Sequence, residues 1–154
     1  VSTNQPGTTY NFSGLSNSAT YYWKVVATNV GGSTTSTAAP WNFQTIVAAP
    51  AAFTQSAPAG GATNQALSGT LSWAGSANAA TYDVYLDTSA NPTTLVSADQ
   101  AGTTYGYSGL ANNTTYRWKV IAKNIAATQE ASNAPLSFTT IVSAPSAFVR
   151  LPRN

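Results

Sequence analysis

The chain has 154 residues, of which 43% are hydrophobic and only 6% are charged, against roughly 25% charged residues in an ordinary soluble domain. It contains no His, Cys or Met, which excludes the usual general base near neutral pH, thiol nucleophiles, disulfides and His- or Cys-based metal sites. A formal net charge of +2 is too small for a nucleic-acid-binding surface. We therefore expect no enzyme, no cofactor and no metal.

The chain contains 23 Thr and 17 Ser. We expect these hydroxyl side chains, and not charged ones, to make the protein surface polar. Threonine is β-branched and favours strands over helices, and no amphipathic helical pattern competes with this preference. A membrane-spanning helix needs about 18 consecutive apolar residues, and the sequence has no such run. The composition predicts an all-β protein that does not insert into a membrane.

The sequence repeats itself at a constant offset of 95 residues. Residues 8–10 reappear at 103–105, and residues 21–25 reappear in nearly the same form at 116–120. Aligned without a gap, residues 1–54 match residues 96–149 at 28 of 54 positions. A period of this length suits a β-sandwich and exceeds the 20 to 50 residues of solenoid repeats.

The pattern Thr-Ile-Val followed by Ala-Pro, at 45–50 and again at 140–145, gives the predicted repeat boundaries. Residues 1–45 are expected to be the C-terminal half of one repeat, and residues 46–140 a complete repeat. Residues 141–154 are expected to be the first strand of a further repeat or a C-terminal tail. This division implies that residues 1–45 lack the first three strands of their own sandwich.

Alternating segments between turn residues predict seven strands in the complete repeat. They lie at residues 52–55, 70–73, 81–87, 93–98, 103–107, 115–124 and 136–140. Because side chains on a strand alternate between its two faces, one set is expected to fill the core. The predicted core residues are Trp73, Tyr82, Tyr105, Leu110, Tyr116, Trp118 and Val120, with Tyr21, Trp23 and Val25 as their equivalents in residues 1–45.

Trp73, the strand at 82–85 and the segment 109–124 together resemble a fibronectin type III domain. Leu110 followed by Tyr116 resembles the tyrosine corner of that family, in which the phenol hydroxyl meets backbone at a turn. The resemblance covers the complete repeat, and residues 14–29 repeat part of it. It implies tandem, immunoglobulin-like, seven-stranded β-sandwiches, a scaffold that serves adhesins, receptors, enzyme linkers and surface layers alike.

The few carboxylates are expected to form ion pairs at the surface and not a catalytic site. Asp83 and Asp87 share the outward face of one strand, opposite Arg117 and Lys119 if the two strands pair as the resemblance implies. We therefore expect these residues to form cross-strand ion pairs on the solvent-exposed face of the sheet. An acid and base pair would need desolvation that a flat strand face does not offer. Because Lys119 points outward, a Lys to Asn isopeptide cross-link is not expected.

Two ligand hypotheses remain open beside the structural interpretation. Calcium at Asp87, Ser89 and Asn91 would have a single carboxylate, which is weak for a hard cation. A carbohydrate platform would rely on scattered outward rings such as Tyr22 and Tyr85. The N-glycosylation pattern occurs at Asn11, Asn112 and Asn113.

These observations lead to one functional expectation. We expect a non-catalytic segment of a long extracellular or cell-surface repeat protein, which acts as a spacer, a surface-display unit or a filament-building module. Its expected partners are proteins, namely neighbouring repeats or subunits, with self-association included. Two alternatives are an accessory module of a secreted polysaccharide-degrading enzyme and a filament subunit completed by strands of neighbouring chains.

Overall fold

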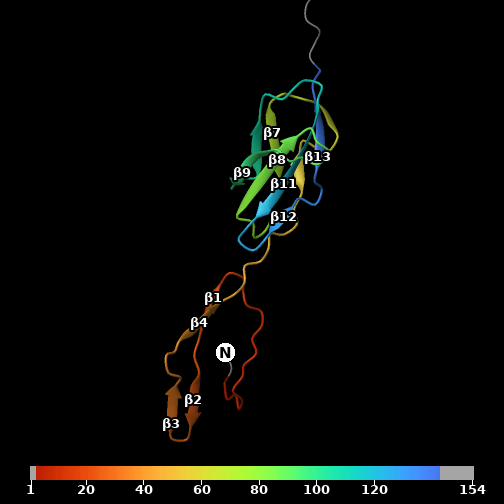
Figure 1. Cartoon of the computed structure of the whole chain (residues 1–154). Coiled ribbons are helices and arrows are strands. Elements are labelled where there is room, and N and C mark those ends of the chain that lie inside the picture. Colours follow the sequence, from red (N-terminus) through yellow and green to blue (C-terminus); the bar gives the residue numbers. More distant parts are fainter. Residues whose placement is uncertain (1–2, 143–154) are drawn as a thin grey trace, which may run out of the picture. The chain divides into compact units, whose positions relative to one another are not determined.

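The computed structural model describes residues 3–142, which form strands, turns and loops without a helix. They divide into two compact units between Ala48 and Ala49, three residues beyond the boundary predicted from the repeat. Residues 143–154, most of the predicted further strand or tail, lie outside the described residues. Figure 1 shows the strands of each unit.

The first unit contains two short antiparallel ribbons. Strand β1 (Thr20–Trp23) pairs with β4 (Trp41–Gln44), and β2 (Val26–Asn29) pairs with β3 (Gly32–Thr35). None of residues 3–48 is buried. The first unit therefore has paired strands but no core of its own.

The second unit is a sandwich of two sheets. Its strands are β5 (Gln55–Ala57), β6 (Ala62–Gln65), β7 (Gly69–Trp73), β8 (Thr81–Asp87), β9 (Leu95–Gln100), β10 (Thr104–Tyr107), β11 (Thr115–Lys123), β12 (Thr128–Glu130) and β13 (Leu136–Thr140). The smaller sheet has the order β10-β7-β5. The larger sheet has the order β6-β13-β11-β8-β9, and β12 pairs with the end of β11.

The core of the second unit lies between these sheets, because both contribute alternate side chains to it. Burial alternates residue by residue along β8 and β11, as expected for strands with one face toward a core. The buried apolar side chains are Phe53, Leu71, Trp73, Tyr82, Val84, Leu86, Tyr107, Trp118, Val120, Ala122, Ala131 and Phe138. Apolar burial on this scale is the main stabilising contribution to such a domain.

Residues 49–142 contain nine strands, two more than the seven predicted. The additional strands are β6, which pairs in parallel with β13, and the three-residue strand β12. Neither has an alternation of apolar and polar residues, because β6 reads Ala-Thr-Asn-Gln and β12 reads Thr-Gln-Glu. Strands held mainly by backbone pairing leave little signal in a hydrophobic pattern.

Candidate functional site

The predicted core residues of the second unit fall into two groups. Four are buried, with Trp118 and Val120 completely inaccessible and Trp73 and Tyr82 nearly so. Three others, Tyr105, Leu110 and Tyr116, are half-buried and pack against the core cluster. These aromatic side chains are therefore structural in this unit, and they do not form a surface platform for a ligand.

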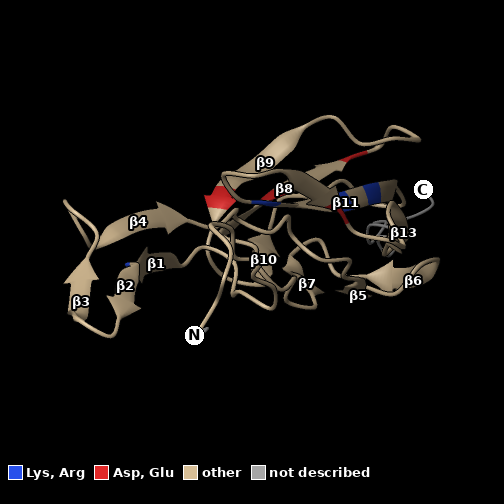
Figure 2. Cartoon of the chain, turned by 90° about the horizontal axis from the view of Figure 1, so that it is seen from below, with Lys and Arg blue, Asp and Glu red and all other residues tan. Residues whose placement is uncertain are grey.

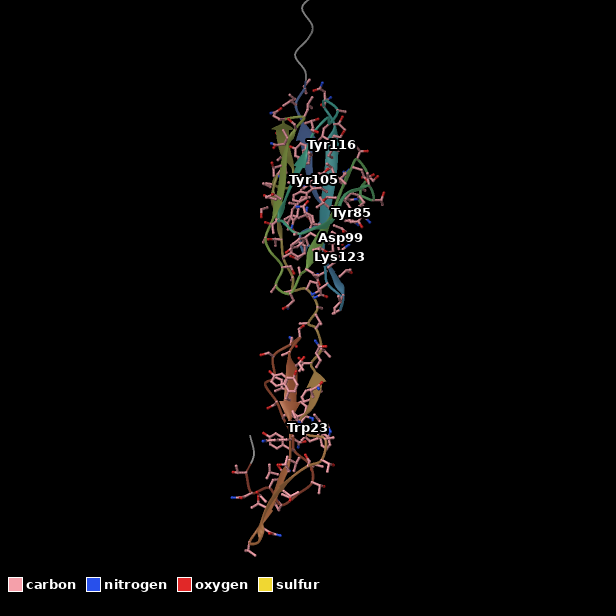
Figure 3. The ribbon with its side chains drawn as sticks, turned by 90° about the vertical axis from the view of Figure 1, so that its left-hand side faces the viewer. Trp23, Tyr85, Asp99, Tyr105, Tyr116 and Lys123 are labelled. Carbon is pink, nitrogen blue, oxygen red and sulfur yellow. The ribbon has the colours of Figure 1, made fainter. Side chains whose placement is uncertain are left out.

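Tyr116 fixes the turn that precedes β11. Its hydroxyl accepts a hydrogen bond from the backbone N–H of Ala111 at 3.1 Å, and its ring stacks on Phe138 with 6.1 Å between centroids. Beside it, the Thr140 hydroxyl accepts from the Thr114 N–H at 3.0 Å and donates to the Ala111 carbonyl at 2.6 Å. Figure 3 labels Tyr116 near one end of the unit.

The same interactions occur in the first unit, 95 residues earlier. The Tyr21 hydroxyl accepts from the Ser16 N–H at 2.9 Å, and Tyr21 stacks on Phe43 at 5.9 Å. The Thr45 hydroxyl accepts from the Ala19 N–H at 3.0 Å and donates to the Ser16 carbonyl at 2.7 Å. Strands β1 and β4 also pair in the register that β11 and β13 use. The first unit thus has the local structure of one half of the second.

Trp23 and Val25 are exposed, which corrects their prediction as core residues. Trp23 is 46% exposed and Val25 is 52% exposed, whereas their equivalents Trp118 and Val120 are 0% exposed. Residues 3–48 contain no counterpart of β5, β7 or β8, the strands that complete the core around Trp118. Tyr21 is half-buried. Trp23 instead packs against Trp41 at 4.7 Å, and Figure 3 shows its position.

The exposed apolar side chains of the first unit whose equivalents line the core of the second unit are Tyr10, Phe12, Trp23, Val25 and Trp41, which we call the open face. Each of these side chains is at least 40% exposed. Their equivalents 95 residues later are all buried or half-buried. Exposed apolar clusters of this kind typically mark interaction surfaces.

An unpaired strand edge borders the open face. In the second unit β11 runs unbroken over nine residues, and Arg117 to Lys123 pair with β8. In the first unit the equivalent stretch is interrupted at Lys24 and Val25, between β1 and β2. No other described strand pairs with β1 besides β4, or with β2 besides β3. The stretch equivalent to β11 is thus divided into two short strands, each with one pairing partner among the described strands.

Among residues 49–142, charged side chains occur only on strands of the larger sheet and on β12, which pairs with it. Figure 2 shows acidic and basic segments on β8, β9 and β11, while β5, β7 and β10 are uncharged. Lys123 Nζ lies 2.7 Å from Asp83 Oδ1 and 2.8 Å from Asp99 Oδ1, and Figure 3 shows Lys123 beside Asp99. The two carboxylates raise the pKa of Lys123, and Lys123 lowers the pKa of Asp99.

The predicted ion-pair partners of Asp83 and Asp87 were wrong. In the observed register Asp83 lies opposite Ile121, so its ion pair forms with Lys123 and not with Lys119. Asp87 lies opposite Arg117, but the Arg117 guanidinium donates to the Thr88 carbonyl at 3.2 Å. The Asp87 carboxylate is directed toward backbone N–H groups instead.

Asp87 organises the loop between β8 and β9. Its carboxylate accepts hydrogen bonds from the backbone N–H groups of Ser89 at 2.7 Å, Thr93 at 2.7 Å and Thr94 at 2.9 Å. Desolvation acts to raise the pKa of Asp87, but the N–H groups of Thr94, Thr93 and Ser89 outweigh it and hold that pKa well below its ordinary value. Both carboxylate oxygens of Asp87, the single carboxylate of the calcium hypothesis, are therefore engaged within the loop.

Lys119 is held at the surface by three groups. Its ammonium donates to Asn91 Oδ1 at 2.9 Å, lies 3.6 Å from Glu130 Oε2 and sits 5.4 Å from the centroid of the Tyr85 ring. Within residues 3–142 no three His, Cys, Asp or Glu side chains gather where they could hold a metal ion. The Lys119 ammonium is thus engaged by neighbouring side chains of β8, β12 and the loop between β8 and β9.

The three asparagines of the glycosylation pattern lie in exposed loops. Asn11, Asn112 and Asn113 are all exposed, and Asn113 has a φ of 47°, a backbone conformation that asparagine tolerates well in turns. The geometry leaves each of these side chains accessible.

No protein-family model matches the chain, and no curated protein matches it. Among solved structures it is similar to the crystal structure of an Fn3-like protein from Clostridium thermocellum, with a TM-score of 0.43 and 17% sequence identity. That alignment covers 65% of this chain and 97% of the other chain. No helix among residues 3–142 is long and apolar enough to cross a membrane.

Proposed function

We propose that the chain is a non-catalytic, structural or adhesive segment of a long extracellular repeat protein built from tandem fibronectin type III-like modules. Each module would serve as a spacer, a surface-display unit or a filament-building unit. The observation that carries this proposal is the recurrence of one set of hydrogen bonds at an offset of 95 residues, seen at Tyr21 and Tyr116.

The chemistry of the second unit supports a mechanical role. All aromatic side chains among residues 49–142 except Tyr85 lie in the core or pack against it. The carboxylates of Asp83, Asp87 and Asp99 bind an ammonium group or backbone N–H groups. A nucleophilic hydroxyl needs a neighbouring base, and the sequence has no histidine. A module of this kind contributes length, rigidity and surface to the protein that contains it.

Single-molecule force spectroscopy tests this proposal on tandem copies of residues 46–140. A load-bearing spacer should unfold in discrete events of equal size, each releasing about 30 nm of chain, since an extended residue spans about 3.3 to 3.6 Å. A featureless extension trace would show that the repeat does not fold as an independent bead, and would refute the proposal.

The enzyme-accessory alternative makes a different prediction. A carbohydrate-binding accessory module should be retained on insoluble polysaccharide without its catalytic partner. We expect the intact chain to pass through cellulose, chitin and xylan as freely as a Tyr22→Ala, Tyr85→Ala variant does. Retention that these two substitutions abolish would favour the accessory role.

A further inference from the structure

The second unit shows what covers the open face in a complete module. Its core contains Leu71 and Trp73 from β7 and Val84 and Leu86 from β8, packed in one cluster with Trp118. Gln55 of β5 also contacts β11, because its Nε2 donates a hydrogen bond to the Trp118 carbonyl at 3.0 Å. Strands β5, β7 and β8 therefore supply both the facing layer and the neighbouring strand.

The register of the missing strand can be read from the second unit. In the antiparallel pair of β8 and β11, Leu86 lies opposite Trp118, Tyr85 opposite Lys119 and Val84 opposite Val120. The offset of 95 residues transfers these positions to Trp23, Lys24 and Val25. A strand with the sequence of residues 81–87 would thus place Leu86 beside Trp23 and Val84 beside Val25.

We propose that the open face of the first unit is a docking site for a polypeptide segment with the strand pattern of residues 49–95. Its β8-like strand pairs antiparallel with residues 22–28, and its β7-like strand lies over Trp23 and Val25. The segment joins β1 and β2 into one strand like β11. This inference rests on the proposed function, because the occupant is part of another module of the same kind.

An intact second copy of this chain is a poor occupant. In the second unit β8 is already paired with β9 and β11, and β7 is already paired with β5 and β10. Their inward side chains are completely or almost completely buried. Releasing these strands for another chain would expose the same apolar area that docking covers, so the exchange gains nothing. The occupant must be a segment not already closed in its own sandwich.

The decisive experiment fuses a second copy of residues 49–95 directly before Val1 of the full chain. Hydrogen exchange followed by mass spectrometry compares residues 20–29 in the fused and unfused proteins. We expect protection of residues 20–29 to rise on the order of 100-fold or more, as stably paired strands gain relative to frayed ones. A matched fusion with Val84→Lys and Leu86→Lys in the added copy should give no rise, because it places charges against the apolar face.

A second arm supplies the strand without a covalent link. A synthetic peptide of residues 78–89 is titrated into the unfused, isotope-labelled chain, with the Val84→Lys, Leu86→Lys peptide as its control. Amide shifts confined to residues 20–29 would show docking in trans, whereas docking in the fusion alone would show that the site needs a linked segment. Both results support the proposal.

Exchange in residues 20–29 that is equally fast in the fused and unfused chains, with no peptide-induced shifts, overturns the docking site. Residues 115–124 of the same samples provide the internal reference. If these also exchange rapidly, the second unit does not fold as an independent module, which contradicts the proposed function itself. Failure of docking alone leaves them protected.

Discussion

Asn133 binds the backbone of Gln55 through two hydrogen bonds. Its Oδ1 accepts from the Gln55 N–H at 2.8 Å, and its Nδ2 donates to the Gln55 carbonyl at 2.9 Å. The side-chain amide thus imitates the edge of a neighbouring strand. This pair connects the first strand of the second unit with the turn before its last strand.

Replacing Asn133 with Ala should lower the free energy of unfolding of the second unit by about 1 to 3 kcal/mol, because it leaves two part-buried backbone groups without partners. Urea denaturation followed by fluorescence measures the change. Asn112→Ala, in an exposed loop, serves as the control and should shift the midpoint little. Equal midpoints for both variants would show that the pair contributes nothing.

Tyr116→Phe removes only the hydroxyl that accepts the Ala111 N–H. We expect a loss of about 1 kcal/mol from the stability of the second unit, the typical net value of one hydrogen bond, with the ring stacking on Phe138 retained. Tyr21→Phe makes the same chemical change in the first unit and is the matched control. The midpoint temperature for thermal unfolding of the second unit should fall in Tyr116→Phe and stay unchanged in Tyr21→Phe.

Asp87 should make the second unit sensitive to acid. Its folded-state pKa is depressed, so its contribution to stability is complete above the pKa of the unfolded chain and is lost as the pH falls toward the folded-state value. Between about pH 7 and about pH 3, the urea midpoint should therefore fall less in Asp87→Asn than in the unchanged protein. Parallel loss in both proteins would contradict the role of the carboxylate.

The four tryptophans should separate into two classes in solution. Trp73 and Trp118 are buried, whereas Trp23 and Trp41 are 46% and 40% exposed. Acrylamide should quench part of the emission readily and leave the rest nearly untouched. The double variant Trp23→Phe, Trp41→Phe should lose the readily quenched part, and Trp73→Phe should keep it. A single quenching class in the unchanged chain would contradict this assignment.

Lys119 should remain a free amine. Its Nζ is engaged with Asn91 and Glu130 on the face of β11 that points away from the apolar core, whereas a cross-link of this kind needs apolar surroundings. The intact mass measured by mass spectrometry should therefore equal the mass calculated from the amino-acid sequence. A mass lower by one ammonia, which disappears in Lys119→Arg, would reveal a cross-link between these residues.

The regular strands of the second unit were predictable because alternating side chains mark a face turned toward a core. The segments at 81–87 and 136–140 match β8 and β13 residue for residue. The predicted strand at 93–98 begins two residues too early, since the N–H groups of Thr93 and Thr94 bond to the Asp87 carboxylate and not to a neighbouring strand. A side chain that competes for backbone donors leaves no periodic signal.

Exposure of the open face could not be read from the alternation. The pattern of residues 20–29 assigns Trp23 and Val25 to the strand face that corresponds to the buried face of Trp118 and Val120, yet both are exposed. A periodic pattern reports which side chains share a side of a strand, but burial also requires a covering layer from elsewhere. The partners of Asp83 and Asp87 likewise depend on strand register.

Within residues 49–142, the restriction of charge to β8, β9, β11 and β12 gives the sandwich two electrically different sides. Near an anionic or cationic surface the ionic side alone experiences a force, and added salt weakens that force within a distance of about 10 Å at 0.1 M. The hydroxyl-covered side formed by β5, β7 and β10 is indifferent to ionic strength. Any charge-driven contact of residues 49–142 would therefore involve the side formed by β8, β9 and β11 and not the side formed by β5, β7 and β10.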